Sequence, residues 1–475
     1  MEISSERKLL LERRNFPKLL NNGLSFIFAI VCIVDVFGVF PIVALPKAII
    51  DCGVTGVLLI AVVCSLQVYT AILLGRCWLL AEEVVPAIQC KNRYPYTALA
   101  EITFGKRVSN YVTILLDLTV FGAGIPNLIL ASQNLQFLGL KLTENAFEIS
   151  YCYWMIILGL AMCPLLWFGS PKDMKLLCTI SVTLVFSVFL LLFGSIVADR
   201  RETRVEIRNF GETSLWQNLL TAYGIISFQF DIHPTVLTIQ MDMNNKMEIK
   251  KAVVGGFLVS LGLFSVTCLS LYVQYGEEVG PSILEMLPSS VFVHLAAALV
   301  AVQLALSSAI SNSALYQHIE DYMGIPREFN QRRCIVRSAL AVLSIIVAES
   351  VPSFDIVMSL IGGAFTGPLV FILPPLFYIK MLSLNERHLI DLQMETVQNI
   401  AADDIETFQD SMTFAQDFSR RRKNTNAPEV LFCSLIIITG ICATLATTYW
   451  NIINTMRYIN FSPPCIVNIY NTTVN

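Results

Sequence analysis

Long apolar stretches recur along the whole chain and alternate with short polar segments. Eleven stretches are close to or longer than the ~20 residues that a helix needs to cross ~30 Å of hydrocarbon. The eleven predicted spans cover residues 24–50, 54–80, 109–137, 151–169, 174–198, 214–240, 248–275, 290–316, 335–352, 354–381 and 429–450. This pattern predicts an all-α integral membrane protein with a single polytopic domain.

Two of the predicted spans carry residues near their middle that disfavour a continuous helix. The first span contains Gly38 and Pro41, and the sixth contains Asp231 and Pro234. An unpaired backbone amide in hydrocarbon costs several kcal/mol, so helices unwind in a membrane only where polar surroundings satisfy the freed groups. Two such breaks predict helices unwound around a shared polar cavity, which is typical of a transporter's binding site.

The positions of the broken spans also predict an internal repeat. Each broken span opens a group of five, and the two groups start on opposite sides of the membrane, as in a leucine-transporter-like inverted repeat. The predicted parts are an N-terminal cytosolic tail (1–23), repeat one (24–198), repeat two (214–381), a cytosolic loop (383–428), an extra helix (429–450) and a C-terminal tail (451–475).

Composition and charge agree with this topology. Hydrophobic residues make up 55% of the chain and charged residues 14%, whereas a soluble domain has about a quarter charged residues. With the N-terminus in the cytosol, 25 of the 32 lysines and arginines fall in or beside cytosolic segments, which is the side where they are retained. An odd number of spans then puts the C-terminus in the extracellular space or a lumen.

The predicted outer segments offer two further features. Asn471 begins the tripeptide Asn-Thr-Thr, an acceptor pattern for N-glycosylation in a lumenal segment. Most of the 13 cysteines lie inside apolar spans, and only Cys52, Cys152 and Cys465 fall near outer loops. One disulfide among these three is compatible with the topology, but spacing does not assign the pair.

Three ionisable residues are candidates for moving protons. Asp35 lies about 11 residues, or ~16 Å, into the first span, where a carboxylate is costly unless it is hydrated, paired or protonated. It is predicted to carry a proton or to contact a substrate ammonium, with a purely structural acid as the alternative. Asp231 and His233 flank the break of the sixth span and could relay a proton, because imidazole titrates near physiological pH. Their alternative role is to cap the broken helix.

Several stretches, in this order and spacing, resemble the amino acid/auxin permease (amino acid transporter transmembrane) family. The carrying stretches are VALPKA (43–48) with two downstream glycines, FQFDIHP (228–234) and SLIGG (359–363). Within that family the vesicular inhibitory amino acid and proton-coupled amino acid transporters look most similar. The resemblance covers roughly residues 24–381 and implies a secondary active amino acid transporter that works by alternating access, coupled to protons.

Together, the breaks and the resemblance give a set of expected site residues. Contacts to the substrate are expected from Val39, Phe40, Ile42, Val43, Phe228, Phe230, Asp231 and Ile232. Proton coupling is assigned to Asp35, Asp231 and His233.

Other functions stay open or are disfavoured by the sequence. An amino acid sensor that signals through the cytosolic loop is the main alternative, and a channel is the least favoured. Ser307, Ser308, Ser311 and Asn312 form a hydroxyl-rich helical face that is expected to pack, with a sodium site as its alternative role. No phosphate-loop, zinc or nucleophile spacing is found, so neither an enzyme, a cofactor nor nucleic-acid binding is expected. The expected surroundings are a lipid bilayer, of the plasma membrane or an endolysosomal or vesicular membrane.

Overall fold

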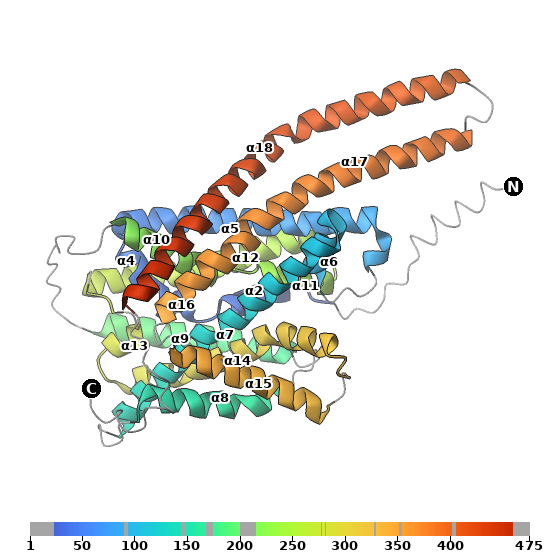
Figure 1. Cartoon of the computed structure of the whole chain (residues 1–475). Coiled ribbons are helices and arrows are strands. Elements are labelled where there is room, and N and C mark those ends of the chain that lie inside the picture. Colours follow the sequence, from blue (N-terminus) through green and yellow to red (C-terminus); the bar gives the residue numbers. More distant parts are fainter. Residues whose placement is uncertain are drawn as a thin grey trace.

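The computed structural model describes residues 23–89, 94–143, 149–167, 174–199, 215–276, 278–280, 282–326, 329–350, 354–400 and 405–458. These residues form a bundle of helices, from which one long hairpin projects (Figure 1). The prediction of an all-α fold is therefore confirmed.

Helices occupy each of the eleven predicted spans, and two further helices lie between spans, at Pro95–Phe104 and Ile283–Met286. They are α2 (Phe26–Phe37), α3 (Phe40–Val43), α4 (Leu45–Ile50), α5 (Gly53–Val84), α6 (Pro95–Phe104), α7 (Lys106–Leu142), α8 (Tyr151–Trp167), α9 (Met174–Ala198), α10 (Leu215–Gln229), α11 (His233–Asp242), α12 (Ile249–Tyr275), α13 (Ile283–Met286), α14 (Val291–Tyr322), α15 (Gln331–Ser350), α16 (Phe354–Ile361), α17 (Leu373–Ile400) and α18 (Ile405–Tyr458). Among the described residues, seven helices are long and apolar enough to cross a membrane, and shorter apolar helices lie at Phe26–Phe37 and Cys152–Pro164. The chain is thus a multi-pass membrane protein, while the count of eleven crossings stays a prediction.

The first predicted span is broken where its glycine lies. The side chain of Ser25 caps the start of α2 by accepting a hydrogen bond from Phe28 N at 3.2 Å. Gly38 ends the helix because its φ of +61° lies in a region that other residues rarely adopt, and its N–H donates to Val34 O at 3.0 Å. The chain then restarts as α3 and α4.

Prolines mark the places where helices restart. Pro41, Pro46 and Pro234 all lie in the first turn of a helix, in α3, α4 and α11 respectively. A first-turn residue has no intrahelical acceptor for its amide, so the missing N–H of proline costs little there. The sequence therefore encodes short helices that begin anew rather than long helices that bend.

The predicted tenth span departs from regular helix in another way. Two π-helical segments, η3 (Gly362–Thr366) and η4 (Pro368–Ile372), lie between α16 and α17. π-Helical turns are rare and frequent at functional sites. Here Gly362 lies against the backbone of Gly224 in α10, since an added Cβ would come within 1.8 Å of Gly224 O.

The ends of the two broken spans are joined by their main chains. Leu24 N donates to Asp242 O at 2.7 Å, and Asn244 N donates to Leu24 O at 3.0 Å, in a parallel bridge between Leu24 and Met243. The start of α2 and the end of α11 are therefore fixed to each other without any side chain.

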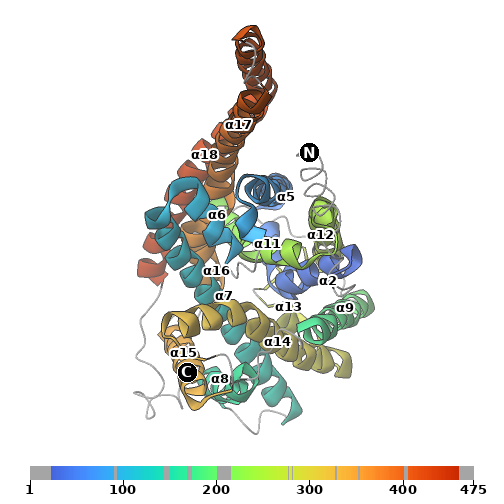
Figure 2. The same ribbon diagram turned by 90° about the vertical axis from the view of Figure 1, so that its right-hand side faces the viewer.

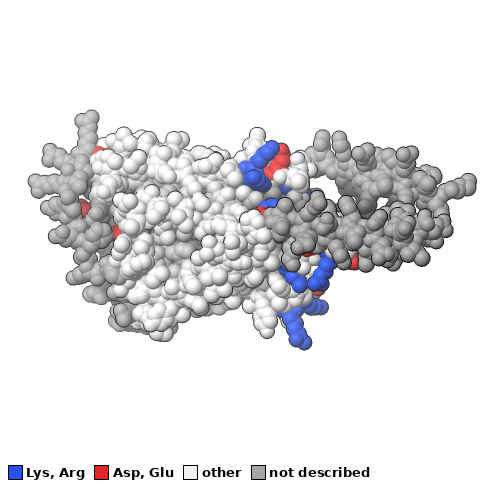
Figure 3. Space-filling view, turned by 90° about the horizontal axis from the view of Figure 1, so that it is seen from above, with Lys and Arg blue, Asp and Glu red and all other residues white. Residues whose placement is uncertain are grey.

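The outside of the bundle is apolar. Val54, Leu58, Leu190 and Leu258 are between 65% and 86% exposed, as expected for side chains that face lipid rather than water. Figure 3 shows a face almost without charged residues, except near the base of the hairpin, where lysines and arginines gather. A charged band of this kind indicates the edge of the membrane.

The predicted loop 383–428 is largely helical. Helix α17 runs to Ile400 and α18 starts at Ile405, and the two lie side by side as they leave the bundle in both views (Figure 1, Figure 2). At the base of this hairpin the Arg76 guanidinium pairs with Glu429, which also accepts a hydrogen bond from Tyr378 Oη at 2.7 Å. The hairpin is thereby attached to α5.

The predictions for the outer segments concern three cysteines and one glycosylation site. Cys52 is a free thiol, whereas Cys152 is disulfide-bonded. Cys465 and the predicted glycosylation site Asn471 lie outside the described residues.

Candidate functional site

A cavity of about 90 Å³ lies between the two broken spans. This volume has room for several water molecules. Five elements enclose the cavity: the α2–α3 break, the α10–α11 break, α7, α14 and η3. Its lining consists of Val36, Phe37, Gly38, Phe40, Thr119, Val120, Ala123, Asn127, Phe228, Gln229, Asp231, Pro234, Thr235, Gln303, Leu304, Ser307, Ser311 and Thr366. The predicted polar cavity between facing breaks is thus present, and we call it the central cavity.

Side-chain amides satisfy backbone carbonyls at the breaks. Gln229 Nε2 donates to Phe37 O at 2.6 Å, which connects the end of α10 to the end of α2. Gln67 Nε2 of α5 donates to Ser227 O at 3.0 Å. Carbonyls in the last turn of a helix lack intrahelical partners, so these glutamines stabilise the two ends inside an apolar bundle.

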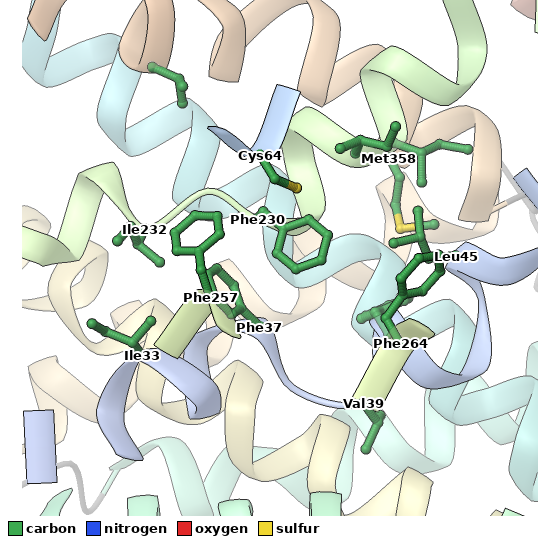
Figure 4. Close-up of a cluster of buried hydrophobic side chains, with 14 of the residues drawn as sticks. Ile33, Phe37, Val39, Leu45, Cys64, Phe230, Ile232, Phe257, Phe264 and Met358 are labelled. Carbon is green, nitrogen blue, oxygen red and sulfur yellow. The ribbon is translucent and has the colours of Figure 1, made fainter. Parts of the chain in front are cut away.

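An aromatic cluster supports the breaks from behind. The ring of Phe37 lies 5.1 Å from Phe230 and 4.9 Å from Phe257, in edge-to-face contacts (Figure 4). Phe230 is fully buried in this cluster and does not line the central cavity. This predicted substrate residue therefore packs between helices in the structure.

Asp231 and His233 form a hydrogen-bonded pair at the start of α11. The carboxylate oxygen Oδ1 of Asp231 accepts from His233 N at 3.0 Å and lies 3.3 Å from His233 Nδ1. On the other side of the imidazole, Nε2 lies 3.0 Å from Thr70 Oγ1. Asp231 lines the central cavity, whereas His233 is buried behind it. Asp231 thus caps the helix and borders the cavity, while the proton-relay role of the pair stays a prediction.

The tautomer of His233 decides how this pair is hydrogen-bonded. With Nδ1 protonated, His233 donates to Asp231 Oδ1, and its Nε2 accepts from the Thr70 hydroxyl. With Nε2 protonated, the ring donates to Thr70 Oγ1, whose hydroxyl lies 2.9 Å from Leu66 O.

Asp35 lies outside the central cavity but is connected to it. Its buried carboxyl lies close to Ser181 and Cys178 of α9, and its Oδ1 atom has no hydrogen-bond partner among the described residues. Ser181 Oγ in turn accepts from Gln303 Nε2 at 3.2 Å, and Gln303 lines the cavity. A row of polar side chains, Ser181 and Gln303, therefore connects Asp35 to the central cavity.

The structure separates the other expected residues into two groups. Phe40, Phe228 and Asp231 line the central cavity. The remaining ones are buried in the bundle and do not line it: Val39, Ile42, Val43, Phe230 and Ile232. On the hydroxyl-rich face of α14, Ser307 and Ser311 face the cavity, whereas Asn312 packs against Gly124.

Sequence reasoning missed several polar residues of the site. Gln229 and Gln303 were detectable in principle, because glutamines within apolar spans require partners. Asn127 of α7 gave a similar signal. The pairing of His318 with Asp117, at 2.6 Å between Nδ1 and Oδ2, joins residues 201 positions apart, so no local pattern could predict it.

The chain was compared with known families, proteins and solved structures. The profile of the family described as "Transmembrane amino acid transporter protein" matches residues 25–400. Amino acid transporter AVT1I of Arabidopsis thaliana is 22% identical over 359 residues, which cover 72% of this chain and 82% of that protein. Amino acid transporter AVT1J of the same plant is 24% identical over 350 residues, covering 72% of this chain and 79% of that protein.

More distant similarities are found as well. Sodium-coupled neutral amino acid symporter 2 of Danio rerio is 27% identical over 197 residues, or 39% of this chain and 37% of that protein. A solved structure of a mutant manganese transporter of Eremococcus coleocola aligns over 91% of this chain and 95% of that chain, with 14% identity and a TM-score of 0.43.

Proposed function

Because the chain belongs to the transmembrane amino acid transporter family, whose profile matches residues 25–400, we propose that it is a secondary active carrier that moves an amino acid across a membrane by alternating access. The observation that carries this proposal is the central cavity between two broken helices. Broken helices can present backbone polar groups to a ligand only beside such a cavity. We further propose that the carrier is coupled to protons.

The proposed topology has eleven crossings in a five-plus-five inverted repeat with one extra helix. The N-terminus lies in the cytosol and the C-terminus in the extracellular space or a lumen, as the distribution of lysines and arginines favours. In this orientation the α17–α18 hairpin projects into the cytosol. The central cavity then lies near the middle of the bilayer, where carriers of this type hold their substrate.

The proposed substrate is a free amino acid whose charged groups lie at the two breaks. Asp231 supplies a carboxylate for the ammonium group, and the irregular backbone at Gly38 faces the rest of the molecule. Phe40 and Phe228 border the space left for the side chain. Five expected residues do not line the central cavity and act on substrate binding only by shaping the two breaks: Val39, Ile42, Val43, Phe230 and Ile232.

Proton coupling is supported by the two carboxyl groups near the cavity. Asp231 Oδ1 lies within hydrogen-bonding distance of the His233 imidazole, and Asp231 borders the substrate position. Asp35 has an oxygen without a partner and reaches the same cavity through Ser181 and Gln303. A proton bound at either place changes the charge that a substrate ammonium meets.

Uptake of labelled amino acids into proteoliposomes tests the proposed function. With purified protein, an imposed pH gradient and no sodium, we expect at least one amino acid of a full panel to accumulate. A protonophore should abolish the accumulation. Uptake driven only by a sodium gradient would refute the proton coupling, and tight binding without any uptake would favour a sensor over a carrier.

Replacing Asp35 with asparagine is expected to uncouple transport from protons. Asparagine keeps the size and hydrogen-bonding capacity of the side chain but cannot carry a proton. Accumulation driven by the pH gradient should fall at least ~10-fold, which corresponds to ~1.4 kcal/mol of driving or transition-state free energy. Exchange of labelled for unlabelled substrate across the membrane should persist. Undiminished proton-driven accumulation would remove this role from Asp35.

Replacing Asp231 separates its capping role from its role toward protons. In Asp231→Asn the side-chain oxygen still accepts from His233 N, so we expect the thermal midpoint to change little. Uptake should nevertheless fall at least ~10-fold, and its dependence on pH should flatten. Asp231→Ala removes the cap as well and should also cost about 1 kcal/mol of stability. Equal uptake by the aspartate and asparagine proteins would contradict the proton role.

A further inference from the structure

A second cavity of about 240 Å³ lies at one end of the bundle, where α4 ends and α10 and α16 begin. In the proposed orientation this end faces the extracellular space or a lumen. Most of its lining is polar or charged. The cavity is lined by Lys47, Ala48, Asp51, Gln217, Asn218, Thr221, Ala222, Ile225, Asp355, Trp450 and Asn454.

The charges of the second cavity are unbalanced. Lys47 Nζ pairs with Asp51 Oδ1 at 2.7 Å, so these two charges neutralise each other. Asp355 lies close enough to both to feel their charges, but within the described part of the chain its carboxylate takes part in no hydrogen bond or ion pair. Among the described lining residues, the two carboxylates of Asp51 and Asp355 outnumber the single cation Lys47. A carboxylate in such a position attracts a cation.

The other lining groups suit an organic ammonium ion. Trp450 contributes an aromatic ring, whose face attracts an ammonium group. Asn454 provides an amide that can donate to a carboxylate or accept from an ammonium, while the amide of Asn218 donates to Asp51 O at 3.3 Å. The pair of Lys47 and Asp51 offers both signs of charge at the same place. A zwitterion with its ammonium toward Asp355 finds a partner for each of its groups.

The second cavity lies next to the central cavity along the same helix. Thr221, Ala222 and Ile225 of α10 line the second cavity, and Phe228 and Gln229 line the central one, only ~4.5 Å further along the axis. On the same stretch of α10, Gly224 is in backbone contact with Gly362 of η3 and with Ser359 of α16. A solute in the second cavity is thus one α10 turn away from the central cavity.

We propose that the second cavity is a binding site for the ammonium group of a free amino acid, with Asp355 as its anionic partner. This site is separate from the central cavity. Its role depends on the proposed function, the transport of amino acids. It holds the substrate before the contact between α10 and η3 opens. Asp355 raises the local concentration of the substrate and so determines the concentration at which transport reaches half its maximal rate.

Charged thiol reagents test this site independently of transport. The full chain with Asn454→Cys is reconstituted in lipid and treated with either the cationic aminoethyl or the anionic sulfonatoethyl methanethiosulfonate. Mass spectrometry of the peptide that contains position 454 gives the rate of labelling by each reagent. After division by the rates with free mercaptoethanol, we expect the cationic reagent to react on the order of tenfold faster. Adding Asp355→Asn should remove most of this preference. Adding Glu278→Gln, an exposed carboxylate outside the cavity, should leave it unchanged.

Protection by amino acids completes the test. The amino acid that is taken up fastest should slow labelling of Asn454→Cys several-fold, and this protection should vanish with Asp355→Asn. A cation preference that survives Asp355→Asn, or the absence of protection by any transported amino acid, would overturn the second site while leaving the carrier intact. Protection by an amino acid without uptake of any would support the site and refute the proposed transport.

Discussion

Gly362→Ala is expected to reduce uptake at least ~10-fold and to lower the thermal midpoint of the purified protein. An alanine Cβ at this position would lie 1.8 Å from Gly224 O and 3.0 Å from Phe228 Cβ. A backbone oxygen cannot rotate away as a side chain can, so α10 and η3 would have to separate. Overpacking of this kind typically costs 1–3 kcal/mol. The same contact must open and close if α10 is part of the path between the two cavities.

A matched control is available on α9. Gly194 is also helical, but an added Cβ there meets nothing within 4 Å. Gly194→Ala should keep uptake and should stabilise the helix by up to about 1 kcal/mol. Measuring uptake and the thermal midpoint for both variants separates the packing effect from the general effect of alanine in a helix. Normal uptake by Gly362→Ala would show that the close contact is not needed.

Arg337→Ala is expected to destabilise the protein by about 3–5 kcal/mol, the range found when one partner of a buried ion pair is removed. Arg337 is 1% exposed and donates to both carboxylate oxygens of Glu320, at 2.5 and 3.2 Å. It also donates to Leu166 O at 2.5 Å, which joins α15 to α8 and α14. Without Arg337, Glu320 stays buried with Arg333 as its remaining partner.

Two controls distinguish a lost pair from a lost side chain. The double variant Arg337→Met with Glu320→Met should recover much of the stability, because it removes both buried charges together. Arg76→Ala, which removes a half-exposed ion pair with Glu429, should cost no more than about 1 kcal/mol. Thermal midpoints in detergent compare all of these variants. A single Arg337 variant as stable as the Arg76 variant would contradict the assigned role.

The sequence was most informative where backbone chemistry decides the structure. Gly38 and Pro234 indicated the two breaks, because a left-handed φ and a missing amide have strong local consequences. The direction in which each side chain points was harder to predict from the sequence. Val39 and Phe40 are adjacent at the first break, yet only Phe40 reaches the central cavity. Which face of a short helical turn points inward depends on neighbouring helices.

Distant partners could not be predicted from a single chain. Asp35 was expected to carry a proton or to contact a substrate ammonium, and its nearest polar neighbours, Ser181 and Cys178 of α9, are nearly 150 residues away. A carboxylate within an apolar span needs a polar neighbour, and the sequence does not say which helix provides it. The same reason explains why the contact between Gln229 and Phe37 O became visible only in the structure.

The bridge between Leu24 and Met243 has a mechanical consequence. It consists of main-chain atoms only, so ordinary side-chain variation during evolution cannot loosen it. Whatever displaces α2 must therefore carry α11 with it. The two helices then move as one unit. Asn244→Pro removes the N–H that donates to Leu24 O, so it is the kind of change that would let them move separately.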